Sequence, residues 1–131
     1  MLTEILHIGF VVRSIDETME QLKKLGGVQL GIKERPHIGQ NSALVQLGNV
    51  RYELMEPNGD VGVVPKFLAK HGPGFHHISF KCDNCDEEAA RLTAEGVVCM
   101  NKVPGDGKTK FFTAPKTSGG VVYEINENYD D

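Results

Sequence analysis

The chain has 131 residues, of which 40% are hydrophobic and 24% are charged, and its formal net charge at pH 7 is −4. This length suits one compact domain, or two small repeats that share a core, and the composition is that of an ordinary globular protein. An acidic chain lacks the dense basic face that nucleic-acid binding requires, and no apolar run approaches the ~20 residues needed to cross a bilayer. Three cysteines, and an N-terminus unlike a signal peptide, lead us to expect a cytoplasmic protein.

The first half of the chain predicts one strand, one helix and three more strands. Residues 5–12 alternate well enough for a strand. Ser14 suits the N-cap of a helix with Asp16 and Glu17 in its first turn, and Gly26-Gly27 ends that helix. Strands are also predicted at 28–32, 42–47 and 50–56, with a tight Gly48-Asn49 turn between the last two.

The second half predicts the same order of elements. It follows a segment at 63–70 that is compatible with a short helix, and a linker at 71–74. The predicted elements are a strand at 75–81, a helix at 86–95 and strands at 97–100, 109–113 and 121–125. Together the two halves predict an α+β fold.

The halves are copies of one unit, because residues of the same type recur at matched positions. His7 matches His77, and Glu53 matches Glu124 at a spacing that is longer by one residue. Further matches are Ile8 with Ile78, Phe10 with Phe80, Gly26 with Gly96, Gly48 with Gly119 and Tyr52 with Tyr123. A self-similarity this long indicates a repeat. Each half is too small to bury a core alone, so we predict a single domain, 1–131, built from repeats at about 5–57 and 75–127.

The matched histidines and glutamates predict a metal site. His7 and Glu53 each stand between apolar neighbours on a predicted strand, and His77 and Glu124 hold the matched positions of the second repeat. All four therefore lie on a face that should point inward. A buried carboxylate is costly unless it is paired or bound to a metal. Two imidazoles and two carboxylates from related halves would surround one cation symmetrically, and they suit a divalent transition metal such as Zn²⁺, Ni²⁺, Co²⁺, Mn²⁺ or Fe²⁺.

Each of these residues alone also has a plainer interpretation. A single histidine in a strand is more often a satisfied core or edge residue than a ligand, and a single glutamate in an alternating strand usually faces solvent. The recurrence of all four at matched positions favours the metal site.

The cysteines predict core packing rather than chemistry. Cys82 and Cys85 match the apolar residues Val12 and Ile15 of the first repeat. We therefore interpret both, and Cys99 with them, as small core residues and not as a redox or zinc motif.

From Ile5 to Glu127 the chain resembles the vicinal oxygen chelate superfamily, which includes glyoxalase I, methylmalonyl-CoA epimerases, extradiol dioxygenases and bleomycin-resistance proteins. The stretches that resemble the epimerase branch are Glu53 to Pro57, Phe67 to Ile78 and Pro115 to Glu124. The resemblance implies two paired βαβββ modules that form a cupped mixed β-sheet around a metal. It also implies that His7, Glu53, His77 and Glu124 occupy the metal-ligand positions.

The resemblance implies a metal-dependent enzyme that removes a proton next to a carbonyl, through an enediolate. The first candidate is an isomerase similar to methylmalonyl-CoA epimerase, with Glu124 as the base and Glu53 as the second candidate on the opposite side. Glyoxalase I (lactoylglutathione lyase) uses the same ligand set and is the alternative. A metal-free ligand-binding or resistance protein of the same fold is a third interpretation. The hairpin at 115–120 favours the epimerase over the glyoxalase.

The expected partners are a small-molecule substrate, either a CoA thioester or a glutathione or other thiol hemithioacetal, and a second copy of the chain in a homodimer. Gln46 and Asn41 could hydrogen-bond the substrate, although a surface role is equally compatible with their positions. Lys116, together with Lys108 and Lys110, could hold a phosphate-bearing tail such as that of CoA, the alternative being a solvated loop.

Two positions depart from the epimerase pattern. Ala114 stands where that branch commonly has a histidine before the Pro-Lys pair. The second catalytic glutamate that some epimerases carry in the third strand aligns near Ser42. A strict two-base racemisation is therefore not implied.

Overall fold

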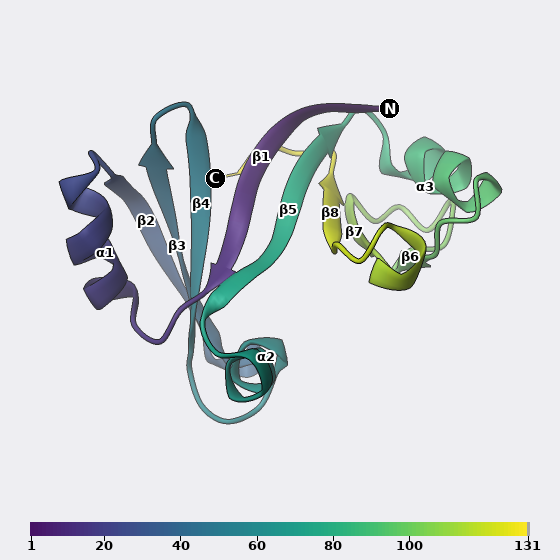
Figure 1. Cartoon of the computed structure of the whole chain (residues 1–131). Coiled ribbons are helices and arrows are strands. Elements are labelled where there is room, and N and C mark those ends of the chain that lie inside the picture. Colours follow the sequence, from purple (N-terminus) through teal and green to yellow (C-terminus); the bar gives the residue numbers. More distant parts are fainter. Residues whose placement is uncertain (131) are drawn as a thin grey trace. The chain divides into compact units, whose positions relative to one another are not determined.

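A computed structural model describes residues 1–130 as an α+β fold with one mixed sheet of eight strands and three α-helices, which confirms the predicted fold class (Figure 1). The strands are β1 (Leu2–Val11), β2 (Val28–Arg35), β3 (Gln40–Leu47), β4 (Val50–Pro57), β5 (Gly74–Cys82), β6 (Cys99–Met100), β7 (Lys110–Thr113) and β8 (Tyr123–Asn126). The helices are α1 (Ile15–Lys24), α2 (Val63–His71) and α3 (Cys85–Ala94), and two short 3-10 helices are η1 (Pro36–Ile38) and η2 (Pro115–Thr117). None of the helices within 1–130 is long and apolar enough to span a membrane.

The chain divides into two compact units. The first unit is His7–His76, and the second consists of Met1–Leu6 and the chain from His77 onward. The strand order is β2-β3-β4-β1 in the first unit and β1-β5-β8-β7-β6 in the second. In each unit the strand with the histidine runs parallel to the strand with the glutamate, as β1 with β4 and β5 with β8. This parallel pair is what positions the candidate site.

Helix α1 begins and ends as its residues predict. The side chain of Ser14 accepts a hydrogen bond from the Glu17 amide at 3.2 Å, which caps the first turn. Gly26, with a φ of 91°, follows the helix in the left-handed region that favours glycine. The apolar side of the helix buries Ile15 and Met19 against the first sheet, in a core completed by Val12, Ala43, Val45 and Leu54.

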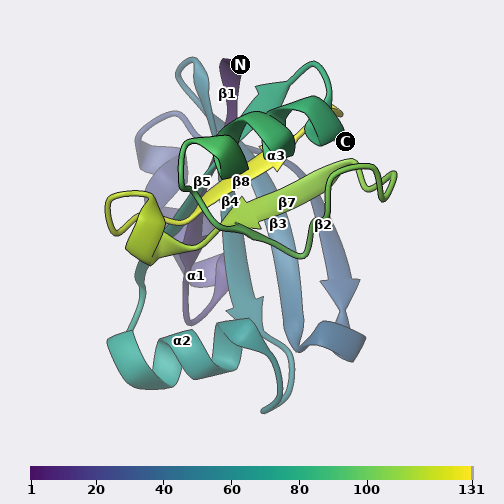
Figure 2. The ribbon, with the colours of Figure 1, turned by 90° about the vertical axis from the view of Figure 1, so that its right-hand side faces the viewer.

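Helix α3 covers the second unit's sheet in the same way (Figure 2). Its N-cap is Asn84, whose side chain accepts from the Glu87 amide at 2.9 Å. The core beneath it consists of Cys82, Cys85, Ala89, Phe111 and Ile125, with Cys99 packed against it. All three cysteines are free thiols, and the first two are buried. The interpretation as core residues is confirmed for Cys82 and Cys85, whereas Cys99 is only partly buried at the edge of that core.

A glutamate at or just past the end of each glutamate-bearing strand anchors the first turn of its unit's helix, α1 or α3, to the sheet. In the first unit Glu56 Oε1 accepts a hydrogen bond from the Ile15 amide at 2.7 Å. In the second unit Glu127 Oε2 accepts from the Cys85 amide at 2.8 Å. These amides belong to the first turn of a helix, where no backbone carbonyl is available to accept from them. The repeat thus extends beyond the core to matched polar contacts.

The strand boundaries of the second unit differ from the prediction. The strand predicted at 97–100 is reduced to β6, and residues 101–109 form a loop built around Lys102. The Lys102 Nζ donates to Asp86, to Asp106 at 2.7 Å and to the Lys108 carbonyl at 2.9 Å. Because the two aspartates neutralise it, a fully buried ammonium is tolerated there. These contacts fix the loop that follows β6. The strand is shorter than predicted at its start, where the Val97 amide donates to the Leu92 carbonyl at 2.9 Å and the Val98 amide donates to Thr117 Oγ1 at 2.9 Å.

The burial of the thiols predicts their reactivity. Burial raises the pKa of the Cys85 thiol to about 12 and also raises the pKa of Cys82. Because the thiolate is the reactive form, we expect Ellman's reagent at pH 8 to modify Cys99 on the order of a hundredfold faster than the other two. In denaturant all three should react. Rapid reaction of three thiols in the native protein, measured at 412 nm, would contradict this packing.

Candidate metal centre

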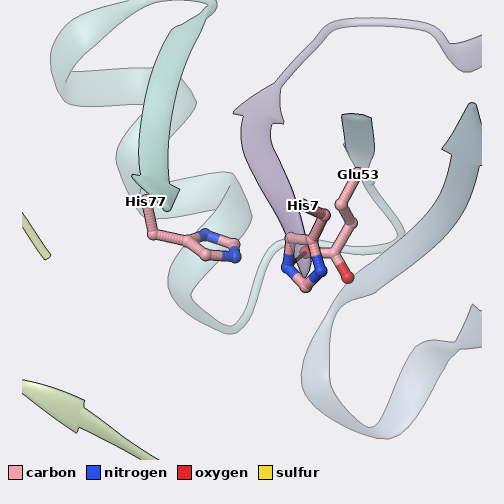
Figure 3. Close-up of side chains that lie close together, drawn as sticks. All are labelled: His7, Glu53 and His77. Carbon is pink, nitrogen blue, oxygen red and sulfur yellow. Dashed lines mark ion pairs between the residues drawn. The ribbon is translucent and has the colours of Figure 1, made fainter. Parts of the chain in front are cut away.

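His7 and Glu53 face each other in the first unit. In the parallel pair of β1 and β4, Gly9 is directly opposite Glu53, so the side chains of His7 and Glu53 lie on the same face of the sheet. His7 Nε2 is 3.8 Å from Glu53 Oε1, and the histidine is only 3% exposed. Figure 3 shows the imidazole and the carboxylate directed toward one another.

His77 and Glu124 repeat this arrangement in the second unit. Ser79 is directly opposite Glu124 in the parallel pair of β5 and β8, and His77 Nε2 is 3.9 Å from Glu124 Oε2. Both residues are buried. Lys110 Nζ lies 3.6 Å from the other carboxylate oxygen of Glu124, and the ring of Phe112 meets the His77 ring edge-on at 6.3 Å.

Alternation along the strands separates the site residues from the helix-covered cores. On β4, Leu54 packs into the core beneath α1, so Glu53 points to the other face. On β8, Ile125 packs beneath α3, and Glu124 therefore points away from that helix. At the end of the first unit's site face, Val11 and Met55 pack against Val64 of α2. Helix α2 thus supplies the apolar border of that face.

The donor set fits a divalent transition metal. Imidazole nitrogen and carboxylate oxygen are the ligands that Zn²⁺ and its neighbours in the first row accept. His7, Glu53 and His77 form a group that could hold a metal ion, and Figure 3 shows their side chains. Glu124 has the same register relation to His77 that Glu53 has to His7. Each unit therefore contributes a histidine and a glutamate of the predicted ligand set.

The predicted substrate residues lie outside these pairs. Within the β3–β4 hairpin, the side chain of Gln46 donates a hydrogen bond from Nε2 to the Gly48 carbonyl at 2.8 Å. Its Oε1 accepts one from Arg51 at 3.3 Å. The Asn41 amide donates to Glu56 at 2.9 Å, so it supports the carboxylate that anchors α1.

The lysines and Ser42 complete the set of predicted positions. Lys116 is exposed on η2. Lys108 Nζ donates to the Asn101 carbonyl at 3.1 Å, and Lys110 is the one that reaches Glu124. Ser42, which aligns near the third-strand glutamate of some epimerases, is buried, and its hydroxyl accepts a hydrogen bond from the side-chain amide of Gln40 at 2.9 Å.

Sequence analysis did not single out Ser79 or Phe112, which flank Glu124 on the neighbouring strands. The internal repeat could have revealed both residues, because their types differ from those at the matched positions of the first unit. Their matched neighbours beside Glu53 are Gly9 and Leu44. Comparing the residues around the ligands, and not only the ligands, would have identified the difference.

Comparison with known families agrees with this geometry. A family model described as the Glyoxalase/Bleomycin resistance protein/Dioxygenase superfamily matches residues 6–113. The chain belongs to this superfamily. The resemblance seen in the sequence is therefore confirmed at the level of the family.

Relatives within the superfamily include methylmalonyl-CoA epimerases. A Bacillus subtilis protein, "Uncharacterized protein YqjC", is 32% identical over 95% of this chain and 92% of its own length. The mitochondrial methylmalonyl-CoA epimerase of Dictyostelium discoideum is 29% identical over 92% of this chain and 76% of its own. A solved structure described as methylmalonyl-CoA epimerase in complex with methylmalonyl-CoA and NH4+ is 29% identical, with a TM-score of 0.83, and covers 95% of this chain and 94% of its own.

Proposed function

We propose that the chain is a divalent-metal-dependent isomerase of the methylmalonyl-CoA epimerase type, which moves a proton at the carbon next to a thioester carbonyl. The observation that carries the proposal is the matched pair of His–Glu contacts, His7 with Glu53 and His77 with Glu124, in which both histidines and Glu124 are buried. The similarity to proteins named methylmalonyl-CoA epimerases supports the substrate class. The two units would then work as one functional domain, because the ligand set needs a histidine and a glutamate from each.

In this proposal His7, Glu53, His77 and Glu124 hold one divalent transition metal. The grouping of His7, Glu53 and His77 as residues able to hold an ion supports it. The metal, when bound, would supply the positive charge that stabilises an enolate-type oxygen of the substrate. The buried faces around both histidines would exclude water, which strengthens electrostatic interactions with that oxygen.

The proton would be taken and returned by Glu124, with Glu53 as the second candidate. A base must reach the proton it abstracts, and a carboxylate beside the bound carbonyl meets that need. Lys110 places a cation 3.6 Å from Glu124. Lys116 and Lys108 remain candidates for binding the phosphates of a CoA tail, and Gln46 for a polar contact with the substrate.

Metal content tests the ligand assignment. We expect the purified protein to contain about one divalent transition metal ion per chain by elemental analysis. His77→Ala should lower the metal content, because it leaves only three of the four proposed ligands and removes one of the two imidazoles. His37→Ala, which changes an exposed histidine on η1, is the matched control. Full metal content in a folded His77→Ala variant would show that the ligand assignment is wrong.

Deuterium exchange at C2 of methylmalonyl-CoA tests the activity. In D₂O the metal-loaded protein should exchange this hydrogen, as followed by NMR. Glu124→Gln should lower the exchange rate by a factor of about 10² to 10⁴, the usual contribution of a general base. Metal content must be measured alongside, since Glu124 is also a proposed ligand. If the metal-loaded protein shows no exchange at C2 and instead converts the methylglyoxal–glutathione adduct, it is a glyoxalase I.

We also propose that the chain forms a homodimer through the edge strand β2 and acts in the cytoplasm. β2 lies at the end of the strand order, and it exposes Val28 by 58%, Leu30 by 48% and Ile32 by 52%. An apolar edge strand is open to pairing with a second chain unless it is covered. The three free thiols fit a reducing compartment.

Light scattering after size exclusion tests the dimer. Ile32→Lys adds a charge to the exposed edge and should convert the dimer into a monomer with its melting temperature little changed. Val61→Lys changes a residue that is 78% exposed outside β2, and it should leave the dimer intact. A monomeric wild-type protein, or a dimer unaffected by Ile32→Lys, would contradict this interface.

A further inference from the structure

The hydroxyl of Ser79 is a buried polar group that the hydrogen bonds of the fold do not explain. The residue is 0% exposed, and within residues 1–130 its Oγ has no hydrogen-bond partner. Burying a hydroxyl without a partner costs stability, and such groups are rare in folded proteins. The missing partner is therefore to be sought outside the chain.

The register places this hydroxyl beside the ligands of the second unit. Ser79 follows His77 by two residues on β5 and is directly opposite Glu124 on β8, so all three side chains lie on one face of the sheet. Phe112 is opposite Glu124 on its other side. The carboxylate thus stands in a row between a hydroxyl and an aromatic ring.

The first unit shows that the architecture does not require the hydroxyl. There the position opposite Glu53 is held by Gly9 on β1, and Leu44 is the neighbour on the other strand. The parallel pairing is the same in both units. A residue with no side chain satisfies the fold at this place, so packing alone does not account for a polar group there.

We propose that Ser79 is a substrate-binding residue whose hydroxyl donates a hydrogen bond to a carbonyl or carboxylate oxygen of the ligand beside Glu124. This inference rests on the proposed function, and it names a contact of the same site. A fixed donor next to the base stabilises the negative charge that develops on that oxygen as the proton leaves. Burial strengthens the bond, because water does not compete for the hydroxyl. Glu124 then has a hydrogen-bond donor as its neighbour on β5, whereas Glu53 has only Gly9 at the matched position on β1.

The test compares Ser79→Ala with the wild-type protein, using Co²⁺ and oxalate as probes. Oxalate offers two adjacent oxygens and does not depend on CoA recognition. We expect Ser79→Ala to bind Co²⁺ as the wild type does but to bind oxalate about tenfold more weakly by calorimetry, as for one lost hydrogen bond to a charged group. Without metal or oxalate, the variant should melt at or above the wild-type temperature, because an unpaired buried hydroxyl has been removed.

Ser14→Ala is the matched control, since the Ser14 hydroxyl has a partner in the Glu17 amide. It should lower the melting temperature and leave oxalate affinity unchanged. Ser79→Gly, which copies Gly9 of the first unit, provides a second variant if Ser79→Ala fails to fold.

The outcomes separate this inference from the proposed function. Unchanged oxalate affinity in Ser79→Ala, with Co²⁺ binding intact, overturns the role of Ser79 and leaves the metal site standing. A melting temperature several degrees lower without ligand also overturns it, because the hydroxyl would then have a partner within the fold. A wild-type protein that binds no Co²⁺ overturns the metal site itself, and the inference with it.

Discussion

The constraint on which the rest of the structure depends is the burial of imidazoles and carboxylates on the open face of a sheet. His7, His77 and Glu124 are almost completely removed from solvent, and such groups are costly unless a charge or hydrogen bond compensates them. Parallel pairing brings the partners together, because it places each histidine and its glutamate on the same face of the sheet. Within each pair the His–Glu distance, 3.8 Å and 3.9 Å, is wide enough to admit a cation between the nitrogen and the oxygen.

The strands that carry the glutamates also hold the helices. Glu56 and Glu127 come three residues after Glu53 and Glu124, on the opposite face, and accept from the first-turn amides of α1 and α3. A shift of β4 or β8 by one residue would both turn the ligand glutamate toward the core and release the helix. The position of the candidate ligands and the docking of the helices therefore share one register.

The two units are more alike in their framework than in the residues around Glu53 and Glu124. The candidate ligands, the helix anchors and the helix-covered cores recur in both units. The neighbours of the two glutamates do not, since Gly9 and Leu44 beside Glu53 correspond to Ser79 and Phe112 beside Glu124. Lys110 adds a cation on the Glu124 side. Two equivalent His–Glu pairs in unequal surroundings would suit the proposed enzyme, in which one carboxylate acts as the base and the other chiefly as a ligand.

The sequence by itself determined the α+β class, the order of elements in both repeats and the four candidate ligands, because periodicity and the internal repeat are local or pairwise properties of the chain. Only the tertiary structure decided where each side chain finds its partner. Gln46 is engaged within its hairpin, Lys102 is buried between two aspartates in a loop, and Ser79 is left without a partner within residues 1–130. Hydrogen bonds and burial depend on segments that pairing brings together from far apart in the chain, and a residue's type does not reveal which of them it will meet.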